Sequence, residues 1–330
     1  MRERALVTGG AGFIGSHLVD RLLEEGTSVT VLDNLTTGRD ENLVAHADDP
    51  RLALVTASVL DEELVDRLVA EHDVVYHLAA AVGVRYVVDD PLNTLLTNVR
   101  GTEYVLASCR RYRRRVVLAS TSEIYGRSDR VPFSEDGDRV LGPTWVHRWS
   151  YSTSKAVDEH LAFAYAEAGL DVAIVRYFNS YGPRIDESGY GSVIARFASQ
   201  ALRGEPLTVH GDGRQTRCFT YVADSVEGTI LAARRHEALG HVFNIGGDRE
   251  VSIHDLAEKI RTMLGSRSPI VTVPYESAYA KGFEDARRRV PDVRKARDIL
   301  GFEATVPLEE GLRRTLAWCR EHYASTRAHA

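Results

Sequence analysis

The feature that most constrains the fold of this chain is a glycine-rich segment close to its beginning. Residues 7–15 read VTGGAGFIG and lie between a short apolar run and a stretch with helical spacing. Glycines let the backbone turn tightly and approach a pyrophosphate closely, and the amides that open the following helix attract its negative charge. The next apolar run ends at Asp33, about 20 residues downstream, where a carboxylate can accept hydrogen bonds from ribose hydroxyls. The sequence therefore predicts a strand, a turn and a helix that bind a dinucleotide.

The acid at position 33 also indicates which dinucleotide is bound. A carboxylate at Asp33 repels the additional phosphate of NADP, so NAD is the predicted cofactor. A glycine pattern alone also occurs in ordinary tight turns, and a single acid is common on protein surfaces. The order of strand, glycines, helix and acid favours the dinucleotide site over that purely structural interpretation.

Short apolar runs alternate with longer amphipathic stretches through the first half of the chain, which is typical of a parallel sheet covered by helices. The predicted strands are 4–8, 28–32, 52–57, 74–78, 115–119 and 172–176. The predicted helices are 13–25, 62–71, 91–113, 152–168, 253–264 and 308–322. Residues 241–245 are predicted to return to the sheet as one more strand.

The predicted fold class is therefore α/β, a Rossmann-type doubly wound parallel sheet with a smaller, interleaved C-terminal lobe. At 330 residues the chain is long for one compact core, which favours two lobes around one site. We expect the dinucleotide-binding domain to comprise residues 1–178 and a returning segment at about 220–246. Residues 179–219 and 247–330 form the predicted second lobe.

The composition argues against several classes of function. A net charge of -6 gives no general attraction to nucleic acid or to an anionic membrane. No apolar run approaches the roughly 20 residues of a membrane-spanning helix, and the start of the chain leaves no room for a signal peptide. Cys109, Cys218 and Cys319 lie far apart, so neither a disulfide framework nor a metal site is predicted. We expect a cytoplasmic protein and assign the basic run 110–115 to a solvated helix end.

Two further segments contain the candidates for catalysis. Tyr151 and Lys155 are four positions apart at the start of a predicted helix, so they share one helical face. A nearby ammonium group lowers the pKa of a phenol, which makes Tyr151 a candidate base for a hydroxyl group. Residues 119–126, ASTSEIYG, follow the fifth predicted strand. Because ligands of doubly wound sheets bind at the carboxyl ends of the strands, we expect both segments at one site. Without that context, a lone Tyr-x-x-x-Lys pair is better explained as a surface pair.

These motifs together resemble the extended short-chain dehydrogenase/reductase family of enzymes that act on nucleotide sugars. The resemblance rests on the glycine segment, on Tyr151 with Lys155, on Asn98 in TNVRGT and on residues 177–183, YFNSYGP. It extends from about residue 6 to the helix at 307–318 and so covers nearly the whole chain.

The resemblance implies a catalytic set of Thr121, Tyr151 and Lys155, and a nucleotide-diphosphate sugar held by the smaller lobe. It also implies a homodimer in which the helices 91–113 and 152–168 of each subunit form a four-helix bundle.

Within this family the chain is most similar to the UDP-glucuronate decarboxylases. Residues 121–123, TSE, occur in them and in GDP-mannose dehydratases, whereas 4-epimerases usually place small residues after the catalytic Ser/Thr. Residues 281–292, KGFEDARRRVPD, resemble the C-terminal signature of the decarboxylases, in which an Arg just ahead of x-Pro belongs to the active site. Arg289 has that place. Residues 141–151 and 215–219 also resemble this subfamily, and Arg217 is expected on the nucleotide side of the substrate.

The resemblance implies that NAD oxidises UDP-glucuronate at C4 and that decarboxylation then gives UDP-4-keto-pentose, UDP-xylose or both. Tyr151 takes the proton of the sugar O4, and Thr121 helps it to stabilise the enolate oxygen that forms when the β-keto acid loses carbon dioxide. Arg289 orients the carboxylate with its planar fork. Glu123, with Ser122, manages the proton or water near C5.

The resemblance also implies which residues contact the two ligands. The expected cofactor contacts are Gly9, Gly12, Phe13, Ile14, Gly15, Asp33, Asn34, Gly38, Ser58, Val59, Leu78, Ala79, Ala80, Asn98, Tyr151, Lys155 and Tyr177. The expected substrate contacts are Arg85, Asn179, Arg184, Val193, Leu207, Arg217 and Arg289.

Alternatives stay open at this point. Decarboxylases that form UDP-xylose commonly show SPPNY after the fourth strand, whereas residues 80–86 read AAVGVRY. TDP-linked substrates and 4-epimerisation of a uronate or a hexose are therefore alternatives. A non-catalytic NAD-binding protein is a third, against which the intact Tyr151 and Lys155 argue. Glu123 also fits a cap of the following turn, and Asp158 and Glu159 are expected at the surface.

Overall fold

The computed structural model describes residues 2–82, 90–187, 192–274 and 286–323. These residues contain a seven-stranded sheet in the order β11-β6-β5-β4-β1-β2-β3, with every neighbouring pair parallel. Its strands are β1 (Arg4–Thr8), β2 (Ser28–Asp33), β3 (Leu52–Thr56), β4 (Val74–His77), β5 (Arg115–Thr121), β6 (Val172–Tyr177) and β11 (Val242–Ile245). The inner strands are almost continuously apolar because both of their faces are buried.

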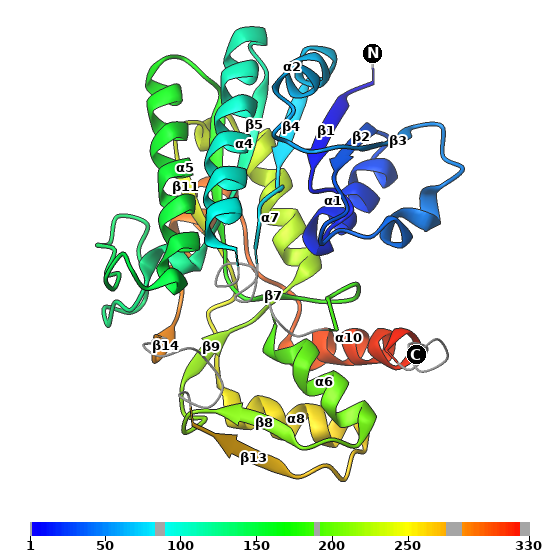
Figure 1. Cartoon of the computed structure of the whole chain (residues 1–330), viewed down its shortest axis with the longest axis vertical. Helices are drawn as coiled ribbons and strands as arrows, with labels where there is room; N and C mark the ends of the chain where they lie inside the picture. The colour runs from blue at the N-terminus through cyan, green and yellow to red at the C-terminus, as the bar shows by residue number, and fades with distance from the viewer. Residues whose placement is uncertain (1, 83–89, 188–191, 275–285, 324–330) are drawn as a thin grey trace.

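Helices cover both faces of this sheet (Figure 1). On one face α2 (Glu62–Glu71) packs against α4 (Pro91–Tyr112), which packs against α5 (Ser150–Glu167). On the other face α1 (Phe13–Glu24) packs against α7 (Val222–Arg234). A separate apolar core lies between the sheet and each helical layer.

The order of the strands reverses at β1. The chain adds β2 and β3 on one side of β1, and β4, β5 and β6 on the other side. Such a reversal opens a crevice at the carboxyl ends of the central strands, which is where ligands bind in doubly wound sheets. The glycine-rich turn leaves β1 at this edge and therefore lies in the crevice.

A smaller lobe is built from the second half of the chain. It contains α6 (Val193–Arg203), α8 (Ile253–Leu264), α10 (Leu308–His322) and a parallel pair of strands, β8 (Leu207–His210) and β13 (Ile270–Val273). One apolar core holds these helices and strands together. Figure 1 shows this lobe beyond the carboxyl edge of the large sheet.

Short strand pairs connect the two lobes. The strand β7 (Ser180–Tyr181) runs parallel to β10 (Thr220–Tyr221). The strand β9 (Thr216–Cys218) is antiparallel to β12 (Glu250–Ser252) and parallel to β14 (Arg288–Arg289). Short helices complete the described chain: η1 (Asp40–His46), η2 (Ser122–Tyr125), η3 (His147–Trp149), η4 (His236–Ala238) and η5 (Ala296–Leu300).

The predicted fold class is confirmed, and β11 joins the sheet beside β6 as expected for residues 241–245. Two boundaries differ from the prediction in a way that matters for the site. The strand β5 continues to Thr121, and α5 already begins at Ser150, so Tyr151 lies inside its first turn. The division of the chain into lobes at 178, 220 and 246 stays a prediction. None of the described helices is long and apolar enough to cross a membrane.

Candidate active site

The glycine-rich turn connects β1 directly to α1. Gly9 has a φ of 71°, and a Cβ there would lie 2.7 Å from the backbone nitrogen of Ala79. A Cβ on Gly15 would collide with the backbone oxygen of Gly9, so α1 packs directly on the turn. Within the described residues no side chain caps α1, and no acid lies in its first turn. Its first amides are therefore available to an anion such as a pyrophosphate.

Asp33 ends β2 beside this turn. Its Oδ2 accepts a hydrogen bond from the amide of Ala11 at 3.0 Å, and its Oδ1 accepts one from the amide of Leu35 at 2.9 Å. A Cβ on Gly38 would lie 2.7 Å from Oδ1, so the glycine leaves room beside the carboxylate. Each carboxylate oxygen has a further lone pair, which can accept a ribose hydroxyl. The turn, the start of α1 and Asp33 thus fit the predicted dinucleotide.

Other candidate cofactor contacts follow the same edge of the sheet. Asn34 comes directly after β2, Ser58 and Val59 follow β3, and residues 78–80 follow β4. These residues therefore surround the crevice as expected, and their contacts with the cofactor stay predictions.

Asn98 and Tyr177 use their polar groups within the protein. The side chain of Asn98 accepts from the amide of Ala81 at 2.7 Å and donates to the hydroxyl of Ser154 at 3.0 Å. It therefore holds the segment after β4 against α5. The hydroxyl of Tyr177 lies 2.6 Å from that of Thr229 on α7. Both residues thus hold neighbouring segments together through hydrogen bonds, and their contact with the cofactor stays a prediction.

Three candidate catalytic side chains meet at the carboxyl end of β5. Thr121 is the last residue of this strand, and Tyr151 and Lys155 lie in the first turns of α5, which packs against it. Thr121 is hydrogen-bonded to the hydroxyl of Tyr151. Its oxygen also accepts the amide of Glu123 at 3.1 Å, so Thr121 and not Glu123 caps the following turn. The structure thus brings together the residues that the sequence pattern selected.

The electrostatics around Tyr151 differ from our expectation. We expected Lys155 to lower the pKa of Tyr151, but the Nζ of Lys155 donates to Asp158 at 2.7 Å, which compensates its charge. Burial raises the pKa of the Tyr151 phenol, and the negative charges of Glu123 and Asp158 raise it further. This arrangement favours the protonated phenol, so Tyr151 must lose its proton before it can act as a base toward a hydroxyl group.

Glu123 lies at the centre of an ion cluster between two arginines. Its Oε2 is 2.5 Å from Nη2 of Arg148, and its Oε1 is 2.7 Å from Nη1 of Arg289. Both guanidinium groups are buried. Burial raises the pKa of Glu123, but the two positive charges outweigh that effect and hold the pKa well below its ordinary value. Glu123 is therefore an ionised carboxylate that is paired with two guanidinium groups. Ser122, the remaining predicted catalytic residue, is buried at the start of η2.

Arg148 is the candidate active-site residue that the sequence analysis did not assign. It lies in η3, directly before α5, and in the segment that resembled the decarboxylases. The available signal was its position three residues ahead of Tyr151, which places both on one side of a helical turn. Of the two arginines of β14, Arg289 faces inward and Arg288 is exposed, because neighbouring residues of a strand point to opposite sides. The catalytic role of Arg289 stays a prediction.

Two acids that we predicted at the surface are buried. Asp158 is paired with Lys155, and Glu159 binds the guanidinium of Arg176 through both of its oxygens, at 2.9 and 2.7 Å. Glu159 also accepts the hydroxyl of Ser120 at 2.5 Å. The expectation was wrong because α5 is enclosed by α4, β5 and β6 at once, so a position that faces away from one neighbour faces another.

Candidate substrate contacts lie at the junction of the two lobes. Asn179 has a positive φ of 42° and donates to the carbonyl of Cys218 at 2.8 Å. Arg184 donates to Asp20 of α1 at 2.7 Å, so its guanidinium points to the large domain. Arg217 of β9 is buried beside the segment that carries Arg289, as the register of β9 with β14 requires.

The other substrate candidates differ in how far they can reach a ligand. Val193 begins α6 at the junction. The side chain of Leu207 is fully buried in the core of the smaller lobe, so a substrate contact there is restricted to the backbone. Arg85 lies outside the described residues.

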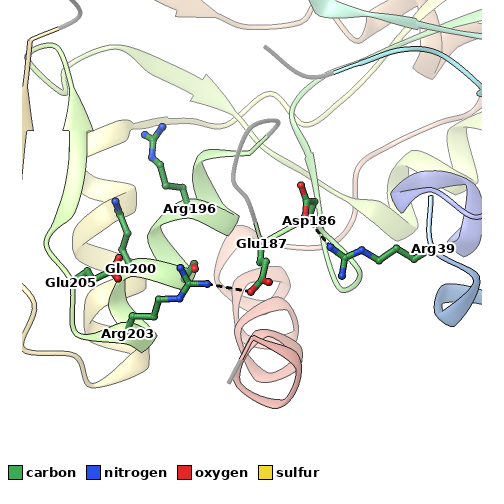
Figure 2. Close-up of a pocket in the computed structure, with 8 residues that line it drawn as sticks. Arg39, Asp186, Glu187, Arg196, Gln200, Arg203 and Glu205 are labelled. Carbon is green, nitrogen blue, oxygen red and sulfur yellow. Dashed lines mark hydrogen bonds and ion pairs between the residues drawn. The ribbon is translucent and has the colours of Figure 1, made fainter. Parts of the chain in front are cut away.

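A hollow of about 360 Å³ lies elsewhere in the junction, lined by α6 and Arg39 (Figure 2). Arg39 is 3.3 Å from Asp186, and Arg203 is 3.5 Å from Glu187. The lining mixes both signs of charge, and it includes none of the candidate catalytic residues. We therefore place the active site at Thr121 and Tyr151 and not in this hollow.

Comparison with known proteins agrees with this architecture. The family described as GDP-mannose 4,6 dehydratase matches residues 6–315, which is nearly the whole chain. The chain belongs to this family.

Individual relatives differ in the reactions that their names state. The chain is 44% identical over 324 residues to a UDP-N-acetyl-alpha-D-glucosaminuronate decarboxylase of Bacillus cytotoxicus, which covers 97% of this chain and 99% of the relative. It is 39% identical to UDP-glucuronic acid decarboxylase 1 of Xenopus tropicalis, over 98% of this chain and 74% of that protein. The solved UDP-glucuronic acid 4-epimerase of Bacillus cereus, in complex with UDP-glucuronic acid and NAD, has a TM-score of 0.86 at 29% identity, covering 96% of this chain and 99% of that chain. One fold thus serves both decarboxylation and epimerisation, so the site has to decide between them.

Proposed function

We propose that this protein is an NAD-dependent decarboxylase of a UDP-linked uronic acid, with UDP-glucuronate as its substrate. The reaction oxidises the sugar at C4 and then releases carbon dioxide, which gives UDP-4-keto-pentose, and return of the hydride to C4 gives UDP-xylose. The observation that carries this proposal is the ion cluster of Glu123, Arg148 and Arg289 beside Tyr151. Its two guanidinium groups suit the carboxylate that a uronate offers and that a neutral hexose lacks. The names of the decarboxylase relatives support the same reaction.

The crevice supplies the groups that a bound NAD requires. The amides at the start of α1 would hold the pyrophosphate, and Asp33 would accept the ribose hydroxyls. When bound, NAD supplies the acceptor for the C4 hydride. The Bacillus cereus relative was solved with NAD, which supports this choice of cofactor.

The residues at the end of β5 control the oxygen at C4. Tyr151 accepts the O4 proton as the hydroxyl is oxidised, and Thr121 is hydrogen-bonded to the same phenol. A ketone at C4 is β to the carboxylate, so the electrons of the breaking bond move into the ketone as carbon dioxide leaves. Tyr151 and Thr121 then donate hydrogen bonds to the developing oxyanion, where preorganised donors have their largest effect.

The ion cluster controls the carboxylate. Arg289 and Arg148 present guanidinium groups whose planar forks suit a carboxylate. Glu123 is ionised in this cluster, so its role at the start of the reaction is to hold the two arginines and not to donate a proton. This assignment restricts the broader acid–base role that we expected for Glu123.

A second substrate is favoured by one specific observation. The relative from Bacillus cytotoxicus, at 44% identity over nearly the full length of both chains, is named for a uronate that carries an N-acetyl group. The same oxidation and decarboxylation at C4 and C5 apply to that sugar, because the substituent at C2 takes no part in either step. TDP-linked uronates stay a further alternative.

The decisive experiment is the product spectrum. Purified protein is incubated with NAD and either UDP-glucuronate or UDP-N-acetylglucosaminuronate, and the products are analysed by mass spectrometry. Loss of carbon dioxide alone indicates the re-reduced pentose, and loss of carbon dioxide together with two hydrogens indicates the 4-keto-pentose. Either result supports the decarboxylase and identifies its substrate. A product of unchanged mass with inverted C4 would instead establish the alternative, a nucleotide-sugar 4-epimerase. Tyr151→Phe is expected to bind NAD without turnover, which separates an enzyme from a non-catalytic NAD-binding protein.

We also propose that the protein is a homodimer in which α4 and α5 of two copies form a four-helix bundle. These helices pack against each other, and they expose the apolar side chains of Leu92 and Val157. Light scattering should report a dimer, and Val157→Glu is expected to shift it toward the monomer. The cytoplasmic location stays a prediction of the sequence.

A further inference from the structure

Lys155 and Asp158 form an ion pair in the interior, one turn apart on α5. The Nζ of Lys155 lies 2.7 Å from Oδ2 of Asp158, and the two side chains are 3% and 0% exposed. A pair so deeply buried is costly to form, and removal of one partner leaves an uncompensated charge in the interior. Asp158 therefore has a stronger influence on Lys155 than any surface acid could have.

Uncharged polar groups continue from this pair toward the glycine turn. Thr102 of α4 is hydrogen-bonded to Asp158, and its hydroxyl lies 3.1 Å from Nε2 of His77. The Nδ1 of His77 lies 2.7 Å from the hydroxyl of Thr8, which ends β1. Burial and the nearby charge of Lys155 lower the pKa of His77 to about 3, so its imidazole is neutral. Of these groups, Asp158 is therefore the one that supplies a negative charge to Lys155.

We propose that Asp158 is a positioning residue that fixes the Lys155 ammonium and sets the pH at which Tyr151 reacts. The proposal rests on the catalytic roles given to Tyr151 and Lys155 above. An ammonium group has three protons. Asp158 binds one of them, which fixes the direction in which the other two point.

The charged groups around Tyr151 show why Asp158 controls this pH. From α5 the charge of Asp158 acts on the phenol, and Lys155 follows one turn after Tyr151 on the same helix. From the neighbouring turns Glu123 also raises the pKa of the phenol, and Arg148, which pairs with Glu123 as Arg289 does, lowers it. The charges of Lys155 and Asp158 together therefore determine how α5 changes the pKa of the Tyr151 phenol. Removal of the Asp158 charge leaves the ammonium uncompensated and favours the phenolate at lower pH.

The first test is the pH dependence of kcat/KM in Asp158→Asn, which keeps the size of the side chain. In the acidic pH range, where kcat/KM of the wild type is still rising, we expect kcat/KM of the variant to reach a roughly tenfold larger fraction of its own plateau value. The reason is that the rise of the variant lies at lower pH. The plateau itself falls, since Lys155 is less well held. Glu167→Gln, which removes an exposed acid of the same helix, is the control and leaves the rise at its wild-type pH. A rise that does not move in Asp158→Asn would overturn the proposal.

The second test needs no turnover. Urea unfolding is compared for the wild type, Lys155→Met, Asp158→Asn and the double variant. Lys155→Met leaves a buried carboxylate alone and should lower the midpoint strongly, and adding Asp158→Asn should restore most of that loss. If the double variant is no more stable than Lys155→Met, the pair does not exist in solution and the proposal fails.

The two tests also separate this proposal from the proposed function. Absence of turnover with every UDP-uronate would refute the decarboxylase, whereas the unfolding cycle would still decide whether Asp158 holds Lys155. If Asp158→Asn does not fold alone, a folded double variant supports the pair, because only the unpaired charge is then intolerable.

Discussion

The buried pair of Arg176 and Glu159 allows a direct test of how far this fold depends on charges in its interior. The guanidinium donates from Nε to Oε1 at 2.9 Å and from Nη2 to Oε2 at 2.7 Å, and the side chains are 7% and 6% exposed. Arg176 also donates to the hydroxyl of Tyr125 at 2.7 Å and lies over its ring. Glu159→Gln keeps the size and shape of the side chain but removes the charge that compensates Arg176.

The magnitude follows from the geometry. With the two charge centres about 4 Å apart and an effective dielectric constant of about 20, the attraction amounts to about 4 kcal/mol. Removal of one partner of a buried pair costs about 3–5 kcal/mol, because the remaining charge stays in the interior without compensation. We therefore expect Glu159→Gln to lower the free energy of unfolding by about 4 kcal/mol, measured by urea denaturation followed by circular dichroism.

A surface pair of similar geometry provides the matched control. Lys259 and Glu309 are 2.8 Å apart, but their side chains are 40% and 66% exposed. Glu309→Gln is therefore expected to cost less than about 1 kcal/mol. If the two variants lose the same stability, burial does not decide the strength of these pairs and our reasoning is wrong. Replacing both partners, as in Glu159→Leu with Arg176→Met, should recover most of the loss.

Three further predictions concern the active site. Because the pKa of Glu123 lies below its ordinary value of 4.5 in the folded protein, the stability that it contributes is complete above about pH 4.5 and is lost as the pH falls. The difference in urea midpoint between wild type and Glu123→Gln should therefore shrink below that pH. Arg148→Met should lower kcat/KM for a UDP-uronate by about 100-fold, through loss of a charged hydrogen bond of about 2–3 kcal/mol, whereas the exposed Arg287→Met should have little effect in the same assay. Gly38→Ala should weaken NAD binding in a fluorescence titration, because its Cβ would meet the carboxylate of Asp33.

The cofactor half of the site could be predicted from the sequence because it is local. The glycine turn and Asp33 belong to one unit of strand, turn, helix and strand, so their order along the chain already gives their arrangement in space. The same holds for Tyr151 and Lys155, whose spacing places them on one face of a helix whatever surrounds it. Both predictions depend on backbone geometry over a few turns and not on the packing of distant segments.

The ion cluster could not be predicted in this way. Glu123 and Arg289 are 166 residues apart, and only the fold brings them within 2.7 Å. Resemblance selected Arg289, whereas the position of Arg148 three residues ahead of Tyr151 is a weak signal, because an arginine ahead of a helix is common on protein surfaces. Asp158 was misplaced for a related reason. Whether a polar residue of α5 is buried depends on its packing against α4, β5 and β6. The spacing of residues along one helix carries no information on these neighbours.

The chain returns to the large sheet at β11 before α10 completes the smaller lobe, and this path fixes the residues that follow Arg289. Asn244 of β11 donates through Nδ2 to the carbonyls of Phe133 and Asp292, at 2.8 and 3.1 Å. Phe133 in turn donates to the carbonyl of Val290 at 2.7 Å and accepts the amide of Asp292 at 2.9 Å. Residues 290–292 are thus fixed to the cofactor-binding sheet by backbone and amide groups.

Arg289 directly precedes this fixed segment, and its position relative to Glu123 follows from it. If β11 belonged to the smaller lobe alone, the arginine would move with that lobe and its distance from Tyr151 would change whenever the crevice opened. The interleaved path instead ties Arg289 to the same sheet that carries Thr121 and the glycine turn. The ion cluster therefore lies against the sheet that carries Thr121 and the glycine turn, although one of its arginines comes from the C-terminal quarter of the chain.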